Sequence, residues 1–212
     1  MNLADLRREY TKSGLRRADL DPDPLGQFHQ WFGQALKSEL LEPSAMTLAT
    51  ADRTGRPSAR IVLLKAADER GFTFFSNYES RKGAELAENP QAALVLYWPE
   101  LEREILIAGD VTKVSRAESE KYFALRPRGS QLGAWVSRQS SAVPDRAFLE
   151  AKLADQETRF ANRTVEIPPY WGGYLLAPVR IEFWQGRPNR LHDRFQYTKQ
   201  ADGSWHIDRL SP

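Results

Sequence analysis

Hydrophobic residues recur at helical spacing in the first part of the chain. They follow Asp23-Pro24, a pair typical of a helix start because Asp caps backbone N–H groups and Pro suits the first helical position. The stripe consists of Phe28, Trp31, Phe32, Ala35, Leu36 and Leu40. It predicts an amphipathic helix that covers a core. His29 lies beside this stripe, so we expect it at the surface rather than in a ligand site.

From residue 45 onward the hydrophobic period changes from that of a helix to that of strands. The segment Asp52-Arg53-Thr54-Gly55 is a hairpin turn signal between the first two strands. Short strands joined mostly by turns favour an antiparallel barrel over a parallel doubly wound sheet. The predicted strands cover residues 45–51, 57–65, 71–76, 91–98 and 103–114.

Helices are expected between and after these strands. Ser80 caps one that runs to Asn89. Ser115-Arg116-Ala117-Glu118 has the capping-box pattern and opens a helix that runs through Leu125 and ends at Pro127. The remaining predicted elements are a helix over residues 145–160, a rigid turn over 167–173 and a final hairpin turn over 201–204.

The apolar run Ile181-Glu182-Phe183-Trp184 predicts a buried strand that breaks at Gly186-Arg187-Pro188. If the chain is extended again after the break, Arg190, His192 and Arg194 lie on one face. Two guanidiniums and an imidazole on one face form an anion-binding surface suited to phosphate. The alternative is an ordinary solvated edge strand.

The first 22 residues differ in composition from the rest of the chain. Residues 1–22 mix charged residues with sparse apolar ones, so we expect a short helix followed by a mobile N-terminal arm. Residues 23–212 show no internal repeat or domain boundary, and we expect them to form a single domain.

Composition narrows the class of protein. The 212 residues are 41% hydrophobic and 27% charged, which is typical of a soluble globular protein. A net charge of +2 does not favour nucleic-acid binding, and the absence of cysteine excludes disulfides and thiolate nucleophiles. No apolar run approaches the ~20 residues that cross a bilayer, and the N-terminus lacks a signal-peptide core. We expect a cytoplasmic protein without a membrane partner.

The motifs of several enzyme classes are missing. The chain has no Gly-x-Gly-x-x-Gly after a strand, no Walker loop, no Gly-x-Ser-x-Gly elbow and no His-Glu-x-x-His. Its three histidines, His29, His192 and His206, are too scattered to indicate a metal site. Dinucleotide-binding folds, ATPases, serine hydrolases and zinc enzymes are therefore disfavoured.

Two clusters of basic residues are candidate anion sites. Arg81 and Lys82 follow Ser80 at a predicted helix N-terminus, where cations are unfavourable unless an anion is bound; a plain solvated first turn is the alternative. Tyr122 and Arg126 share a helix face, with Ser130 just beyond; here the alternative is an Arg that only stabilises the helix C-terminus.

The C-terminal segments Trp184-Gln185-Gly186, Arg190-Leu191-His192-Asp193-Arg194-Phe195 and Asp208-Arg209-Leu210-Ser211-Pro212, with Trp205, closely resemble the signature of the pyridoxamine 5′-phosphate oxidase family. The resemblance extends over nearly the whole chain. It implies a mainly β fold with flanking helices, the FMN-binding split β-barrel, and a homodimer with FMN between the subunits.

The resemblance also implies roles for individual residues. It assigns Arg81 and Lys82 to the FMN phosphate. It also makes Trp184 an FMN contact, whereas the sequence alone favours a core position for that residue. The implied FMN contacts are Arg60, Ile61, Val62, Leu63, Leu64, Lys65, Phe75, Ser76, Arg81, Lys82, Glu104, Gln139, Ser140, Trp184 and Arg194. Glu104 departs from the family, which usually has Gln there, and a carboxylate donates no hydrogen bond unless protonated.

For the substrate, the resemblance implies a second phosphate site and a lid. The implied contacts are Arg7, Tyr10, Lys65, Tyr122, Arg126, Ser130, Arg190 and His192. Arg190 and His192 are the candidate catalytic residues that orient the pyridine ring, and no metal is implied. Arg7 and Tyr10 form the lid, although the sequence alone favours a solvated tail for them.

The implied reaction oxidises pyridoxamine or pyridoxine 5′-phosphate to pyridoxal 5′-phosphate, with O2 as electron acceptor and H2O2 as product. Two alternatives remain open. One is a related split-barrel flavin reductase, and the other is a non-catalytic protein that binds FMN or pyridoxal phosphate. A nucleic-acid module is disfavoured by the balanced charge.

Overall fold

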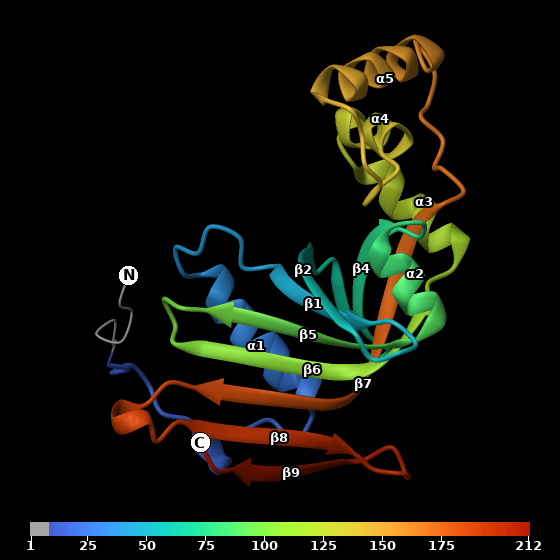
Figure 1. The fold of residues 1–212 in the computed structure, drawn as a ribbon. Helices are drawn as coiled ribbons and strands as arrows, with labels where there is room; N and C mark the ends of the chain where they lie inside the picture. Colours follow the sequence, from blue (N-terminus) through green and yellow to red (C-terminus); the bar gives the residue numbers. More distant parts are fainter. Residues whose placement is uncertain (1–8) are drawn as a thin grey trace.

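The computed structural model describes residues 9–212, and its centre is one antiparallel sheet. All nine strands of the described residues belong to this sheet, and its main path runs β2-β1-β5-β6-β7-β4-β3 (Figure 1). The strands are β1 (Ala45–Ala51), β2 (Pro57–Leu63), β3 (Ala66–Asp68), β4 (Gly71–Asn77), β5 (Gln91–Trp98), β6 (Arg103–Lys113), β7 (Trp171–Gln185), β8 (Asp193–Lys199) and β9 (Trp205–Leu210). The predicted antiparallel, mainly β architecture with flanking helices is confirmed.

Strand β7 makes the sheet branch and curl. One edge of β7 pairs with β6, while the other edge pairs first with β4, over residues 171–176, and then with β8, over residues 180–185. Pro178 lies between these two stretches, where a residue without a backbone N–H costs no ladder bond on that edge. Opposite it, the register of β6 shifts between Ala108 and Gly109, a bulge that bends the strand.

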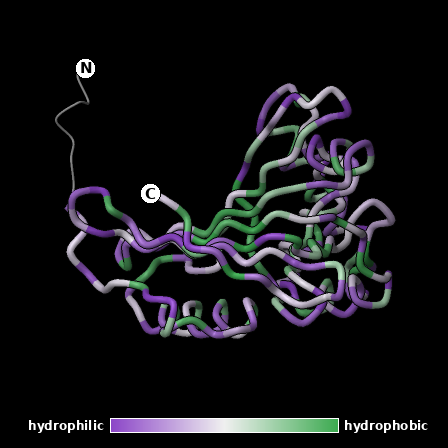
Figure 2. The backbone as a smooth tube through the Cα atoms, turned by 90° about the horizontal axis from the view of Figure 1, so that it is seen from below, coloured by the Kyte–Doolittle hydropathy of each residue, from purple (hydrophilic) through white to green (hydrophobic). Residues whose placement is uncertain are grey.

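Helix α1 (Pro24–Leu36) covers one face of the sheet, which we call the core face. Asp23 caps the helix by accepting from the Gly26 N–H at 3.1 Å, as the sequence predicted. Phe28 packs edge-on against Phe72, and Trp31 against Phe183, with ring centroids 5.0 and 5.3 Å apart. Burial of each such ring contributes roughly 2–3 kcal/mol. Figure 2 shows apolar segments gathered in the strands, whereas helices alternate between apolar and polar positions.

The other α-helices lie at the end of the sheet where β7 begins, and α4 (Arg128–Val136) and α5 (Arg146–Arg159) project away from it (Figure 1). Their apolar residues form a second core that includes Phe123, Leu132 and Trp171. His29 of α1 is exposed, as expected. The remaining helices are α2 (Arg81–Glu88) and α3 (Arg116–Leu125), with short 3-10 helices η1 (Arg17–Asp19) and η2 (Pro188–Arg190).

Most predicted element bounds hold to within one residue, but four elements differ. The turn expected over residues 167–173 is shorter, because β7 begins at Trp171. The strand expected over 57–65 ends at Leu63, and the chain continues into the short β3. Helix α1 ends at Leu36, four residues before the last residue of the predicted stripe, and Leu40 packs on the core from the following turn. Helix α4 was not predicted, because Pro127 ends α3 as expected but also begins α4.

The N-terminal arm packs on the core face of the sheet through Leu15 and Leu20. Leu15 is buried, and its N–H donates to the Asp193 carboxylate at 3.0 Å. Tyr197 in β8 donates its hydroxyl to the Asp21 carbonyl at 2.6 Å. The 3-10 turn η1 is the arm's only helical element among residues 9–22, and residues 1–8 lie outside the described part of the chain. The mobility of the arm stays a prediction.

Candidate active site

A cavity of about 660 Å³ lies between β2, β4 and helices α2, α3 and α4. We call it the phosphate cavity because its wall collects most of the basic residues singled out in the sequence. Of the predicted contacts, it brings together Arg60, Ile61, Val62, Leu63, Lys65, Phe75, Ser76, Arg81, Lys82, Tyr122, Arg126, Gln139 and Ser140. Its volume lies within the ~300–1,000 Å³ range of ligand pockets.

Apart from the predicted group at the other end of the sheet, described below, two predicted contacts do not line this cavity. Leu64 follows the last residue of β2 and is buried with the core residues. Ser130 is exposed on the first turn of α4, where its N–H donates to the Pro127 carbonyl at 2.8 Å. Ser130, expected just past the end of α3, therefore lies in the unpredicted helix α4.

Helix α2 forms one end of the cavity. Ser80 caps it and accepts from the Gly83 N–H at 3.3 Å, as predicted. Lys82 is only 7% exposed and donates to the Gln139 Oε1 at 2.7 Å. Burial, and then the charge of Arg60, lower the pKa of Lys82 to about 8. A buried amine beside the N–H groups of a helix start is a strong anion site.

A second cationic group, with aromatic neighbours, forms the opposite wall. Tyr122 stacks on Phe75, with ring centroids 4.0 Å apart and planes at 20°. The Arg126 guanidinium lies over the Trp171 ring at 4.6 Å, and burial lowers its pKa. Its Nη1 is buried without a hydrogen-bond partner among the described residues. An unsatisfied buried guanidinium nitrogen fits an incoming anion, because it otherwise carries the full cost of lost hydration.

Another predicted group gathers at the other end of the sheet. The rings of Tyr10, Trp184 and His192 contact one another, with centroids 4.6 to 5.6 Å apart. We call these three rings the aromatic cluster. Glu104 of β6 lies directly across from Trp184 in the sheet, and Arg194 of β8 lies across from Trp184 on its other side.

The charged side chains around the aromatic cluster differ in how well they are paired. Arg194 donates from Nε to Glu182 at 2.6 Å, a strong ion pair. Glu104 is half-buried, and burial followed by the charge of Glu182 raises its pKa, while Arg194 lowers it. His192 accepts at Nδ1 from the Arg187 N–H at 3.1 Å, so a neutral ring carries its proton on Nε2. Burial and the neighbouring Arg190 and Arg194 lower the pKa of His192 and favour that neutral ring.

The prediction that Arg190, His192 and Arg194 alternate on one extended strand was wrong. Arg190 lies in η2 with a φ of 59°, beside Asn189 at 57°, and β8 begins only at Asp193. Pro188 starts this short turn because its fixed φ suits a helix start. Arg190 is exposed, whereas His192 faces Trp184. Arg7 lies outside the described residues.

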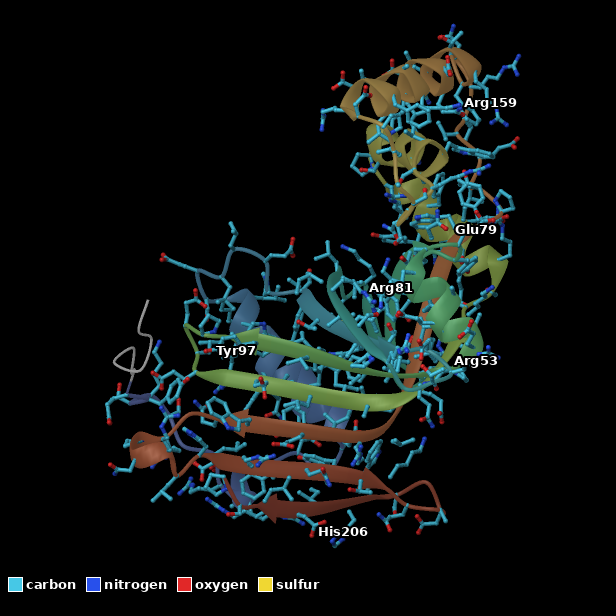
Figure 3. The ribbon with its side chains drawn as sticks, viewed as in Figure 1. Arg53, Glu79, Arg81, Tyr97, Arg159 and His206 are labelled. Carbon is cyan, nitrogen blue, oxygen red and sulfur yellow. The ribbon has the colours of Figure 1, made fainter. Side chains whose placement is uncertain are left out.

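The phosphate cavity and the aromatic cluster are far apart within one chain. Trp171 at the cavity begins β7, and Trp184 at the cluster stands near its end. At ~3.3 Å per residue, an extended strand separates these positions by up to roughly 40 Å. Figure 3 likewise shows Arg81 near α2 and Tyr97 at the distant end of β5. The two predicted groups therefore do not form one site within a single chain.

Sequence reasoning missed several residues of the cavity wall. Ser58 alternates with Arg60 on β2, and Asn77 alternates with Phe75 on β4, so the period-two pattern contained a signal for both. Gly133, Ala134 and Ser137 were missed because helix α4 was not predicted. Ser140, which was predicted, has a φ of 75°, a strained conformation found at many binding sites.

Residues 9–212 contain no group of three His, Cys, Asp or Glu side chains placed to bind a metal ion. Within the same range, every helix is too short or too polar to cross a membrane.

Comparison with known protein families gives two matches. Residues 32–159 match the family model "Pyridoxamine 5'-phosphate oxidase". Residues 171–212 match "Pyridoxine 5'-phosphate oxidase C-terminal dimerisation region".

Individual proteins are similar over the full chain. A protein of Ralstonia nicotianae named pyridoxine/pyridoxamine 5'-phosphate oxidase 1 is 59% identical over 100% of this chain and 99% of its own length. A Cyanothece protein named pyridoxine/pyridoxamine 5'-phosphate oxidase is 56% identical over the same shares. The crystal structure of PhzG from Burkholderia lata, in complex with tetrahydrophenazine-1-carboxylic acid, is 32% identical and superposes with a TM-score of 0.87 over 92% of this chain and 95% of that one. An FMN-binding protein of Nostoc punctiforme, 18% identical, matches in fold with a TM-score of 0.72 over 91% of this chain and 100% of that one.

Proposed function

The chain belongs to the pyridoxamine 5′-phosphate oxidase family, and from this premise we propose that it oxidises pyridoxamine or pyridoxine 5′-phosphate to pyridoxal 5′-phosphate with FMN as cofactor. It is an oxidase with a split-barrel fold. The observation that carries the proposal is a single cavity lined by two cationic sets. Two phosphorylated rings, one cofactor and one substrate, need two such sets within reach of each other.

The residues at the α2 end fit the phosphate of FMN. Arg60, Arg81 and Lys82 bring three positive charges to the N-terminal turn of a helix, which suits a dianion. The segment of β2 from Ile61 to Leu63 extends along the cavity wall beside the place where the flavin ring would lie. When bound, FMN supplies a two-electron acceptor, and O2 then takes the electrons to give H2O2.

The opposite wall fits the phosphate of the substrate. Arg126 offers the unsatisfied Nη1 and Lys65 offers an exposed amine, while Tyr122 is held in place by its stack on Phe75. These residues would bind and orient the substrate rather than take part in bond making. With the amine substrate, water supplies the carbonyl oxygen and ammonia leaves; with the alcohol, only two hydrogens leave.

We propose that the working site combines the phosphate cavity of one subunit with the aromatic cluster of its partner in a homodimer. The description of the matched C-terminal region as a dimerisation region supports this proposal. The face of the sheet opposite α1, which we call the open face, also supports it, because this face exposes a large apolar side chain. Ile61 lies there and is 63% exposed, in the same cross-strand row as Thr47 and Val95. A neighbouring row on this face is lined by small residues, Ala59, Ala49, Ala93 and Ala108.

The open face also carries both parts of the proposed site. Ile61 lines the phosphate cavity, and Glu104, Trp184 and Arg194 form a cross-strand row on the same face. Two copies packed through this face can therefore bring one cluster against the other cavity. In that arrangement Arg190 and the neutral His192 would orient the pyridine ring, and Tyr10, with Arg7, would close over it.

A direct test is to purify the protein, record its absorbance and add pyridoxamine 5′-phosphate in the presence of O2. We expect a yellow protein whose H2O2 release matches the pyridoxal 5′-phosphate formed. A yellow protein that releases no H2O2 with either vitamin substrate would favour a flavin reductase or a binding protein instead. A colourless protein that takes up no added FMN would contradict the proposal altogether.

The similarity to PhzG favours one second candidate, the oxidation of a reduced tricyclic carboxylate such as the compound in that crystal structure. This substrate carries a carboxylate rather than a phosphate. We expect the two candidates to differ in their dependence on Arg126, since a phosphate dianion carries more negative charge than a carboxylate. Turnover of both compounds by the wild type and by Arg126→Ala separates them.

A further inference from the structure

Glu85 is a buried carboxylate on α2 that does not line the phosphate cavity. Its Oε2 accepts from the Thr50 and Ser58 hydroxyls, both at 2.5 Å, and from Arg60 Nη2 at 3.2 Å. Its Oε1 accepts from Arg81 Nε at 2.9 Å. Both arginines line the cavity, so this one carboxylate joins two of the three cations at its α2 end.

Glu85 is ionised under ordinary conditions. Burial alone would raise its pKa, but the hydrogen bonds from Ser58 and Thr50, followed by those from Arg81 and Arg60, lower the pKa to about 2. The carboxylate therefore stays charged at any pH at which the protein is used. It offsets the mutual repulsion of the cations around it before any ligand is present.

We propose that Glu85 is the positioning residue of the flavin phosphate site: it holds Arg60 and Arg81 in the geometry that receives the phosphate. This inference rests on the proposed FMN function. Glu85 acts through the two arginines, because both of them line the cavity and Glu85 does not. Its effect is to orient donors in advance, so that less side-chain freedom is lost when the phosphate binds.

Two effects of this carboxylate oppose each other. Its negative charge repels a phosphate, whereas its hydrogen bonds fix the phosphate donors. Arg60 and Arg81 screen the charge, and Arg81 has few other restraints, since its side chain is 65% exposed and its only described hydrogen bond goes to Glu85. Orientation therefore outweighs repulsion, and removal of the charge weakens phosphate binding.

The test compares Glu85→Gln with the wild type by titrating flavin-free protein with FMN and, separately, with riboflavin, which lacks the phosphate. We expect the Kd for FMN to rise about 10-fold, as for loss of other residues that orient ligand-binding groups, and the Kd for riboflavin to stay unchanged. Glu88→Gln is the matched control, because it removes the same charge from an exposed position on the same helix. It should leave both constants unchanged.

A pH profile gives a second, independent measurement. The charge of Glu85 raises the pKa of Lys82, so its loss should move the alkaline decline in FMN affinity to lower pH. If Glu85→Gln folds poorly, Glu85→Asp keeps the charge one methylene short of the arginines and should still weaken FMN more than riboflavin.

Other outcomes contradict the inference in distinct ways. Unchanged or tighter FMN binding by Glu85→Gln, while the wild type binds FMN, would refute the positioning role alone. Equal loss of FMN and riboflavin would show that Glu85 only maintains the fold. A wild-type protein that binds neither flavin would overturn the proposed function, and the positioning role with it.

Discussion

The burial of Lys82 affects a measurable property of the site, the pKa of its amine. In the free protein its amine is buried and has a pKa of about 8, and a bound phosphate dianion would raise that pKa. The sequence predicted its place at a helix N-terminus. It did not predict the hydrogen bond to Gln139, because that contact joins segments 57 residues apart.

The titration of Lys82 predicts a pH dependence for FMN binding. Below pH 8 the amine is charged and attracts the phosphate; above pH 8 the free protein must first take up a proton, so affinity falls as pH rises. We expect the Kd for FMN to increase by up to ~10-fold for each pH unit above the pKa. Lys82→Ala should bind FMN more weakly at every pH and lose this dependence. A titration series from pH 6.5 to 9.5 measures both, and an unchanged slope in the variant would exclude Lys82.

Glu104 is the residue whose chemistry departs from the family pattern, and its environment predicts an effect on the flavin. Burial and the charge of Glu182 raise its pKa, so its ionised form is destabilised beside the proposed position of the flavin ring. A nearby negative charge disfavours the reduced, anionic flavin. Glu104→Gln should therefore raise the flavin midpoint potential by roughly 10–20 mV, the equivalent of about 0.5–1 kcal/mol for a two-electron couple.

Spectroelectrochemical titration of both proteins at pH 8 measures this shift. At lower pH the shift should shrink, because Glu104 takes up a proton and then resembles Gln. A potential that moves downward, or that does not depend on this residue at any pH, would show that Glu104 does not lie near the flavin.

Among the elements, those with strong local signals were predicted well. Asp23, Ser80, Ser115 and Asp145 each accept from a backbone N–H at the start of their helix. Strand periods gave the bounds of β1 and β5. Helix α4 was missed because Gly129 and Gly133 weaken its helical pattern, and tertiary packing of Leu132 compensates.

Strand β7 depends on a close approach that only glycine permits in β6. A Cβ added to Gly109 would lie 2.0 Å from the Ala177 carbonyl oxygen, so the backbone at the bulge would have to move. Gly109→Ala should lower the free energy of unfolding by roughly 2–3 kcal/mol, measured by urea or thermal denaturation. Gly33→Ala is the control, because nothing lies within 4 Å of its added Cβ and alanine favours the helix. Equal stability of the two variants would contradict the packing argument.

At the scale of the whole molecule, the sequence predicted the antiparallel fold but not the distribution of its candidate site. Residues that the resemblance placed around one flavin lie at opposite ends of β7. Hydrophobic periodicity defines faces and elements, whereas the separation of Lys82 from Arg190 follows from strand order and from the branch at Pro178. A composite site between two subunits accounts for this separation, and it predicts a result that a site within one chain does not.

The prediction concerns two inactive variants that complement each other in a mixed dimer. Lys82→Ala damages the phosphate cavity and Arg190→Ala damages the opposite end of the sheet, so each homodimer should have little activity. When the two variants are unfolded together and refolded, half of the dimers are mixed, and each mixed dimer has one site with both parts intact. Activity should recover to about a quarter of the wild-type value for random pairing in a two-fold dimer. Each variant refolded alone is the control. If the site lay within one chain, every site in the mixture would stay damaged and no activity would return.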